Sequence, residues 1–188
     1  MSALGPAPGP RHRFTVEQAH KLVEVGIVDP DAPYEFVRGA FFYRPRHEVA
    51  HALAIGRLEA LYRDVPEPTL WTGRVPIVCC PDSLPEPDFI LLRDARCLEE
   101  QRYAHGAECL LVVEVGVSSL PYDRWKACLY AEAGAPEFWV LDATTRRIER
   151  HRHPLSAEGR YAELRILDPT DDIELPVLGQ VVQVGTLF

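Results

Sequence analysis

The sequence predicts an α/β fold with a central mixed β-sheet and α-helices packed around it. Apolar runs of strand length, such as 110–113 and 137–142, alternate with longer segments of helical character, such as 46–63 and 120–133. A chain of 188 residues is long enough to bury a core without the help of disulfides. We therefore predict one domain over residues 14–188, preceded by a flexible Pro- and Gly-rich N-terminal arm at 1–13.

The composition is that of an ordinary soluble globular protein, with 47% hydrophobic and 26% charged residues. No segment approaches the length of a membrane span, and the first residues lack the apolar core of a signal peptide. The five cysteines show no Cys-x-x-Cys spacing, which argues against a zinc site or a disulfide framework and favours reduced thiols in a cytoplasmic protein. A formal net charge of −8 excludes a basic face that would grip nucleic acid through its phosphates, and leaves only a local patch for that purpose.

The N-terminal third predicts a helix, a hairpin and a second helix. Thr15 with Gln18 three residues later predicts a capped helix that runs to about Val25 and stops at Gly26. The segments 34–37 and 40–43 flank Arg38-Gly39, a plausible two-residue hairpin turn. Residues 46–63 predict a helix in which Glu48 and His51 share the edge of a partly apolar stripe. Either the two side chains form a half-exposed ion pair one turn apart, or one of them lies at the rim of a functional site.

The middle of the chain predicts three strands. Residues 69–80 form the first, which Pro76 interrupts or confines to a sheet edge. A proline-stiffened turn then places Asp88 at the first position of a short apolar strand, and a polar connection of undefined structure follows at 98–105. The run 110–113 predicts a strand buried on both faces, with Glu114 near its end on the same side as Leu110 and Val112.

The C-terminal part begins with a well-defined helix at 120–133. Ser119 and Pro121 start it, Asp123 complements the helix dipole, and Gly134 ends it. Lys126 leaves this helix beside apolar neighbours. A strand at 137–142, a hairpin formed by 146–153 and 161–167, and a short strand with an apolar end at 171–188 complete the chain.

Three side chains in this order carry the main chemical signal. An ionised Glu114 in a buried strand is costly unless a metal, a cation or a hydrogen-bond donor meets it. Asp88 on one strand and Glu114 on the next can hold one hard divalent cation that keeps several waters, with the backbone carbonyl of Val115 as a further ligand. Such an ion acidifies a bound water and shields phosphate charge, and the nearby ammonium of Lys126 neutralises a developing oxyanion. The pattern predicts a phosphodiesterase.

Each of these residues also has a structural interpretation. Asp88 alone is typical of a turn before a strand. Glu114 alone is typical of a buried acid that pairs with Lys126 or with an arginine. Lys126 alone is typical of a surface lysine whose side chain covers apolar neighbours. Ser118 with His51 and Asp123 would make a hydrolase triad for a small-molecule esterase, but no nucleophile-elbow motif accompanies them.

A dense basic run also has two interpretations. It is either a strip that contacts phosphates or one side of a solvated hairpin. Its members are Arg146, Arg147, Arg150, His151, Arg152 and His153.

Several motifs resemble the Uma-type family of bacterial nucleases, which belongs to the restriction-endonuclease-like, or PD-(D/E)XK, superfamily. The motifs are Pro87-Asp88, Glu114-Val115, Asp123-Arg124-Trp125-Lys126 and the block Tyr130–Asp142, and the resemblance extends to Tyr34–Gly39, His51 and the Leu187-Phe188 ending. It spans about residue 14 to the end of the chain.

The resemblance implies a restriction-endonuclease-like fold and a metal-dependent endonuclease that cuts nucleic acid, most simply DNA. It implies that Asp88 and Glu114 bind Mg²⁺ or Mn²⁺ and that Lys126 is the catalytic lysine. Possible auxiliaries are Glu35, Glu48 and His51.

One position departs from the signature of the superfamily. Gly116 stands two residues after Glu114, where a lysine is expected, and Lys126 is the replacement that the next helix offers. Gly116 and the acidic net charge also motivate an alternative, a catalytically inactive nuclease-like homodimer that acts as a binding or regulatory module.

Overall fold

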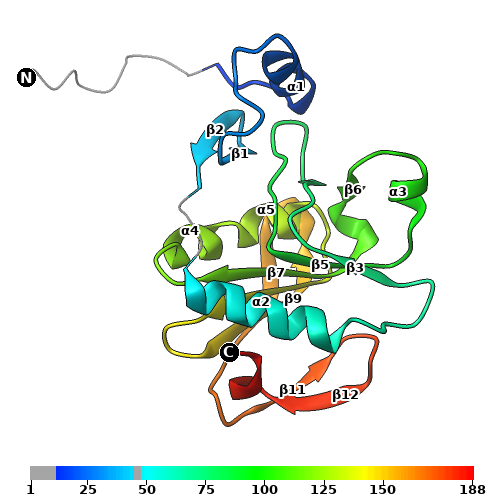
Figure 1. Cartoon of the computed structure of the whole chain (residues 1–188), viewed down its shortest axis with the longest axis vertical. Helices are drawn as coiled ribbons and strands as arrows, with labels where there is room; N and C mark the ends of the chain where they lie inside the picture. Colours follow the sequence, from blue (N-terminus) through cyan, green and yellow to red (C-terminus); the bar gives the residue numbers. More distant parts are fainter. Residues whose placement is uncertain (1–11, 45–47) are drawn as a thin grey trace, which may run out of the picture.

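A six-stranded mixed sheet forms the centre of the computed structural model, which describes residues 12–44 and 48–188 (Figure 1). The strand order is β10-β9-β8-β7-β5-β3, and within it β7 and β8 pair in parallel while the other neighbours are antiparallel. The strands are β3 (Leu70–Thr72), β5 (Phe89–Leu92), β7 (Cys109–Gly116), β8 (Glu137–Asp142), β9 (Arg147–Leu155) and β10 (Arg160–Leu167). The prediction of a mixed central sheet is confirmed.

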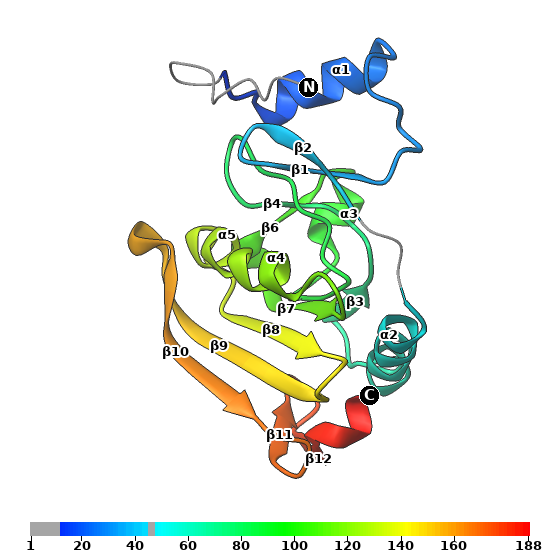
Figure 2. The same ribbon diagram turned by 90° about the vertical axis from the view of Figure 1, so that its left-hand side faces the viewer.

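Helices cover both faces of this sheet (Figure 2). On one face, α2 (Val49–Leu61) packs with the hairpin β11 (Asp172–Leu175) and β12 (Gln180–Gln183) and with the C-terminal turn η3 (Val184–Leu187). On the other face lie α4 (Leu120–Trp125) and α5 (Ala127–Glu132), beside the turn η2 (Ser156–Glu158). Each face has its own apolar core, so β7 and β8 are buried on both sides, as expected of strands that read as continuous apolar runs.

A smaller group of elements lies above the sheet in Figure 1 and includes the N-terminal helix. It consists of α1 (Val16–Glu24), the hairpin β1 (Tyr34–Val37) and β2 (Ala40–Tyr43), the short parallel pair β4 (Ile77–Val78) and β6 (Ala104–His105), α3 (Arg96–Glu99) and the turn η1 (Gly106–Glu108). An ion pair of 2.5 Å between Arg38 of the hairpin turn and Glu132 of α5 connects the hairpin to the helices on the central sheet. This ion pair joins the turn of the hairpin to α5 on one face of the central sheet.

Local signals placed several elements correctly. The capping box of Thr15 and Gln18 opens α1. Arg38 and Gly39 both have positive φ, 50° and 75°, as a two-residue hairpin turn of this kind requires. The strands at 137–142 and in the C-terminal hairpin also lie where the sequence predicts them.

Two predicted elements are divided in the structure. The strand predicted at 69–80 is two short strands in different sheets, β3 and β4, so the interruption expected at Pro76 is confirmed; Pro76 lies between the two strands, and the backbone also turns at Arg74, where φ is 56°. The single helix predicted at 120–133 is divided at Lys126, which ends α4 and begins α5.

Three other differences concern ends and connections. The second helix begins at Val49, with Glu48 as its N-cap, and the predicted start at Arg46 falls outside the described residues. The connection at 98–105 contains the end of α3 and the strand β6. Of the predicted N-terminal arm, the structure describes only His12 and Arg13. Within the described residues, no helix has both the length and the apolar character needed to cross a membrane.

Candidate active site

Glu114 enters the site through the alternation of β7. Leu111, Val113 and Val115 face the core beneath α2, and Val112 faces the core beneath α5. Glu114 therefore points to the same face as Val112, and only 2% of its surface is exposed. Leu110 lies on the opposite face, contrary to the prediction, because the register between β5 and β7 shifts by one residue at Leu91/Leu92 and so interrupts the alternation.

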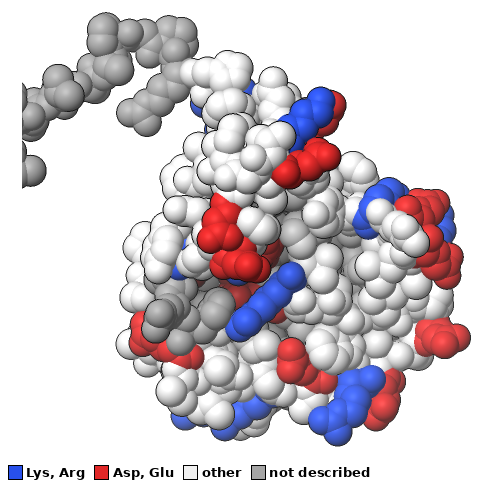
Figure 3. All heavy atoms as spheres, turned by 45° about the horizontal axis from the view of Figure 1, so that its top comes forward, with Lys and Arg blue, Asp and Glu red and all other residues white. Residues whose placement is uncertain are grey.

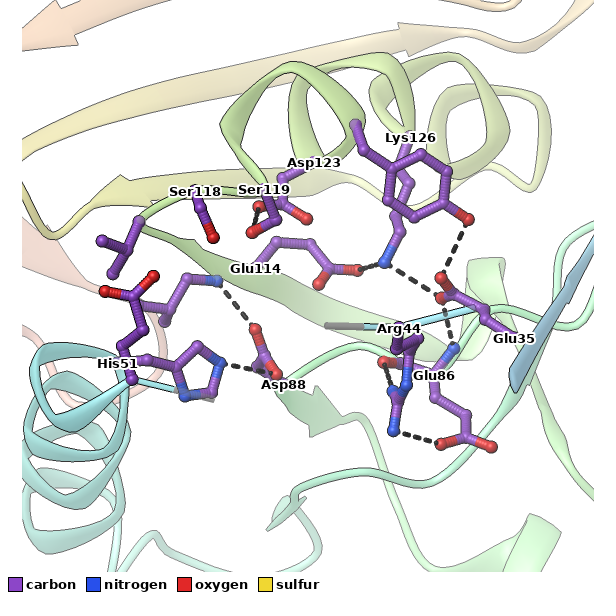
Figure 4. Close-up of a pocket in the computed structure, with 14 residues that line it drawn as sticks. Glu35, Arg44, His51, Glu86, Asp88, Glu114, Ser118, Ser119, Asp123 and Lys126 are labelled. Carbon is purple, nitrogen blue, oxygen red and sulfur yellow. Dashed lines mark hydrogen bonds and ion pairs between the residues drawn. The ribbon is translucent and has the colours of Figure 1, made fainter. Parts of the chain in front are cut away.

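Lys126 meets Glu114 from the junction of α4 and α5. Its Nζ lies 3.0 Å from Glu114 Oε1 and 2.9 Å from Glu35 Oε1, and the residue is 3% exposed (Figure 4). Tyr130, one helical turn further along, also donates its hydroxyl to Glu114 Oε1. The predicted convergence of a strand carboxylate and a helix ammonium is therefore present.

Asp88 turns inward at the start of β5 and is 7% exposed. Its Oδ2 accepts the backbone N–H of Val115 at 2.9 Å, and its Oδ1 lies 3.0 Å from His51 Nε2 (Figure 4). Since the N–H and the carbonyl of one strand residue face the same neighbour, the Val115 carbonyl also faces the side of the strand where Asp88 lies. The carboxylates of Asp88 and Glu114 and the Val115 carbonyl thus lie near one another at the end of β7.

Glu35 completes the cluster from the separate β1–β2 hairpin. Besides Lys126, its Oε1 accepts the backbone N–H of Glu86 and its Oε2 accepts the Tyr122 hydroxyl, both at 2.9 Å. Glu86 is held in turn by Arg44, with an ion pair of 3.0 Å. Sequence reasoning missed Tyr122, Tyr130, Glu86 and Arg44 as members of the site. A signal existed for the two tyrosines, which lie four residues before and after Lys126 and therefore share its side of the helical segment.

The absence of a side chain at Gly116 has a steric reason. A Cβ at this position would lie 2.6 Å from Asp123 Oδ2 and 2.7 Å from Leu120 Cδ2, well inside van der Waals contact. A side chain at this position would have to displace the Asp123 carboxylate and the Leu120 side chain, which pack from α4 against β7. Lys126 supplies the ammonium from the helical side instead.

The cluster carries more buried acid than base, and burial is the main cause of the raised pKa values among its acids. Burial raises the pKa of Glu114 well above its ordinary value, and Lys126 opposes that shift. Burial also raises the pKa values of Asp123 and Glu86. Burial alone would lower the pKa of Lys126, but Glu114 and Glu35 outweigh it and raise the pKa, so Lys126 remains a cation. A site with this surplus of carboxylates favours an additional cation.

Asp88 behaves differently from the other acids. Burial alone would raise its pKa, but the hydrogen bonds from His51 and from the Val115 N–H outweigh burial, and the pKa is lowered. Asp88 is therefore an anion at neutral pH, a state suited to binding a cation.

These residues line a cleft with an acidic mouth. Figure 3 shows acidic side chains gathered around a hollow in one face of the molecule, with a basic side chain beside it. The space in the cleft is about 60 Å³, and a single water needs roughly 10–15 Å³ on the same measure. The cleft therefore has room for a cation with a few waters. Its acidic lining residues are Glu35, Glu48, Glu86, Asp88, Glu114 and Asp123, and its basic ones are Arg44 and Lys126.

The remaining sequence hypotheses have mixed outcomes. Glu48 and His51 both line the cleft, the first exposed and the second buried. The Ser118–His51–Asp123 triad is absent: His51 pairs with Asp88, and Asp123 accepts a hydrogen bond of 2.6 Å from Ser119.

The basic run of β9 is mostly neutralised, which favours its structural interpretation. Arg147 pairs with Asp168, Arg150 and Arg152 pair with Glu137, and His153 lies 3.5 Å from Glu163. Arg146 donates to the Gly185 carbonyl, and His151 is buried among aromatic rings.

Comparison with known proteins places these observations in a family. Residues 16–185 match the family model Uma2, described as "Putative restriction endonuclease". A crystal structure from Anabaena variabilis ATCC 29413, described as "a putative nuclease belonging to DUF820", superposes with a TM-score of 0.73 at 15% identity, covering 93% of this chain and 97% of that one. At this identity the likeness concerns the fold alone, and it confirms the predicted fold class. A search of curated proteins finds no match.

Proposed function

The chain belongs to the Uma2 family, and on that premise we propose that it is a metal-dependent endonuclease that hydrolyses phosphodiester bonds of DNA. The observation that carries this proposal is the convergence of Asp88, Glu114 and Lys126 on one cleft. Asp88 binds the backbone beside Glu114, and the Lys126 ammonium lies 3.0 Å from the Glu114 carboxylate.

The donor set suits Mg²⁺ or Mn²⁺. Among the described residues, no three His, Cys, Asp or Glu side chains form a ready-made metal cage. Mg²⁺ does not need one, because it is usually held by one or two carboxylates and keeps several waters. The Asp88 oxygens each retain a second acceptor position, and both described donors to Glu114 use Oε1, so we expect Oε2 to take the cation. Asp88, Glu114 and the Val115 carbonyl would hold the ion, which when bound would acidify a water and offset phosphate charge.

The chain's own side chains supply orientation and charge. Lys126 remains protonated and offers N–H donors to a phosphate oxygen as negative charge develops on it. Glu35 fixes the ammonium, and Tyr122 and the Glu86 N–H fix Glu35. His51 is a positioning residue, because it holds Asp88 through Oδ1.

Paired ligand variants test this proposal. Asp88→Asn and Glu114→Gln keep the shape of the side chains and remove their charge. We expect each to abolish Mn²⁺ binding in calorimetry and to lower Mn²⁺-dependent nicking of supercoiled DNA by at least about 100-fold. Glu174→Gln, an exposed acid on β11, is the matched control and should change neither. Unchanged Mn²⁺ binding in either ligand variant would remove the metal assignment.

The non-catalytic homodimeric module remains the competing hypothesis. Gly116 motivated it, and the contact between Lys126 and Glu114 supplies an ammonium in spite of Gly116. DNA bound stably by the protein, but not cut in the presence of Mg²⁺ or Mn²⁺, would favour the module over the enzyme.

A further inference from the structure

A strip of three aromatic side chains, Phe42, Tyr122 and Trp125, lies at the mouth of the cleft. Tyr122 lines the cleft itself. Its ring centroid lies 6.1 Å from that of Phe42 and 5.8 Å from that of Trp125, and the Tyr122 and Trp125 rings are stacked at 17°. Phe42 and Trp125 are each 43% exposed. The strip therefore joins the catalytic cluster to solvent.

The elements that build the site also build this strip. Phe42 is the cross-strand partner of Glu35, so one face of the hairpin carries Glu35 into the cleft and Phe42 against Tyr122. On α4, Tyr122 and Trp125 are three residues apart and share a side. The Tyr122 ring is held by Glu35 at its hydroxyl and lies 4.9 Å from Lys126 Nζ. A platform fixed in this way loses little conformational freedom when a ligand stacks on it.

Large aromatic side chains that are exposed beside a catalytic cleft, as Phe42 and Trp125 are, mark a binding surface. Nucleobases stack on such rings, at about 1–3 kcal/mol per base, only when their own faces are free. In an intact duplex those faces are covered by neighbouring base pairs. The chemistry of the strip therefore matches unpaired bases.

The charge of the molecule also favours unpaired DNA over duplex DNA as the substrate. Binding to duplex DNA depends on many phosphate contacts with Lys and Arg. This chain has a formal net charge of −8, the mouth of its cleft is acidic, and three of the four arginines of its basic run, Arg147, Arg150 and Arg152, are paired with carboxylates. Binding that relies on the stacking of bases needs fewer phosphate contacts.

We propose that the substrate is single-stranded DNA or an unpaired DNA segment, whose bases stack on the exposed rings of Phe42 and Trp125, which Tyr122 supports, while the adjoining phosphate enters the cleft. This inference rests on the proposed nuclease function for the role of the phosphate. The stacking itself does not depend on cleavage.

Binding measured without cleavage tests the proposal. Fluorescence anisotropy of a labelled 12-nucleotide single strand and of the duplex of the same sequence, with Ca²⁺ in place of Mg²⁺, should show that the wild type binds the single strand at least about tenfold more tightly. Trp125→Ala and Phe42→Ala should each weaken single-strand binding by about 5- to 100-fold and leave duplex binding unchanged. Trp125→Phe should retain most of the affinity.

Controls keep this result separate from folding and from catalysis. Tyr103 is 38% exposed, contacts His20 of α1 and is not among the residues that line the cleft, so Tyr103→Ala should leave binding unchanged. Thermal unfolding of each variant shows whether the fold is intact. If the duplex binds as tightly as the single strand, or if folded Trp125→Ala and Phe42→Ala bind like the wild type, the inference is overturned. Failure to cut DNA in Mg²⁺ or Mn²⁺ would instead overturn the nuclease function and leave the binding result standing.

Discussion

Lys126 is buried between two carboxylates that come from distant parts of the chain. Its ammonium lies within 3.0 Å of both Glu35 and Glu114, and all three side chains are at most 3% exposed. A buried charge without its partner costs far more than the intact pair contributes. The same residue therefore supports the fold and supplies the cation of the cleft.

Lys126→Met separates these two contributions. We expect it to lower the free energy of unfolding by about 3–5 kcal/mol, because it leaves two buried carboxylates without a cation. Adding Glu35→Gln in a double variant should restore part of the stability, measured by urea unfolding at pH 7, but no nuclease activity. A single variant as stable as the wild type would show that the buried pair is not needed for folding.

His151 is a buried residue whose titration should contribute to the pH dependence of stability. It is 9% exposed on β9, with ring centroids 5.4 Å from Phe138 and 5.6 Å from Tyr161. Burial lowers its pKa, against an opposing effect of Glu149. The unfolded chain therefore takes up a proton below about pH 6.5 that the folded chain resists, and stability falls as the pH decreases through that value.

Replacement of His151 by Leu should flatten this pH dependence. The free energy of unfolding, followed from pH 7.5 to 5, should decline less steeply in His151→Leu than in the wild type. Parallel profiles for wild type and His151→Leu would contradict the assignment.

At the scale of elements, the close approach of α4 to β7 bears on which element supplies the ammonium of the cleft. Gly116 allows Asp123 and Leu120 to come within distances that a Cβ would not tolerate. The helical segment then breaks at Lys126, so that α4 and α5 both pack on the same face of the sheet. The lysine therefore reaches Glu114 from the helix rather than from the strand.

Two glycine variants check this packing. Gly116→Ala should lower the free energy of unfolding by about 1–3 kcal/mol, since its Cβ would overpack the contact between β7 and α4. Gly56→Ala is the matched control: it lies inside α2, a Cβ there meets nothing within 4 Å, and the change should stabilise by about 0.5–1 kcal/mol. Equal effects of the two changes in urea unfolding would argue against the steric explanation.

At the scale of the whole molecule, charge limits how nucleic acid is held. The net charge is −8, and the cleft contributes acidic side chains to the surface that faces a substrate (Figure 3). Affinity that depends on few phosphate contacts responds weakly to salt.

We therefore expect a shallow salt dependence of single-strand binding. With about two phosphate contacts, the affinity should fall by less than about tenfold between 50 and 200 mM salt, as measured by anisotropy in Ca²⁺. A loss of 1,000-fold or more over the same range would indicate a binding mode dominated by phosphates.

The sequence by itself determined the features that depend on neighbouring residues. The capping box at Thr15, the turn at Arg38-Gly39 and the apolar strands at 110–113 and 137–142 follow from local backbone preferences and side-chain alternation. The sequence also indicated which elements carry Asp88, Glu114 and Lys126, because each of these residues lies at the start, within or near the end of a strand or helix that the sequence predicts.

Tertiary structure alone decided how distant segments meet. Glu35 and Tyr122 are 87 positions apart, yet they share a hydrogen bond because the β1–β2 hairpin docks against α4. The same docking assembles the aromatic strip, and the helical segment at 120–133 is divided at Lys126, where α4 gives way to α5. Such contacts depend on the shapes of surfaces formed only when the chain folds, and no local pattern of residues encodes them.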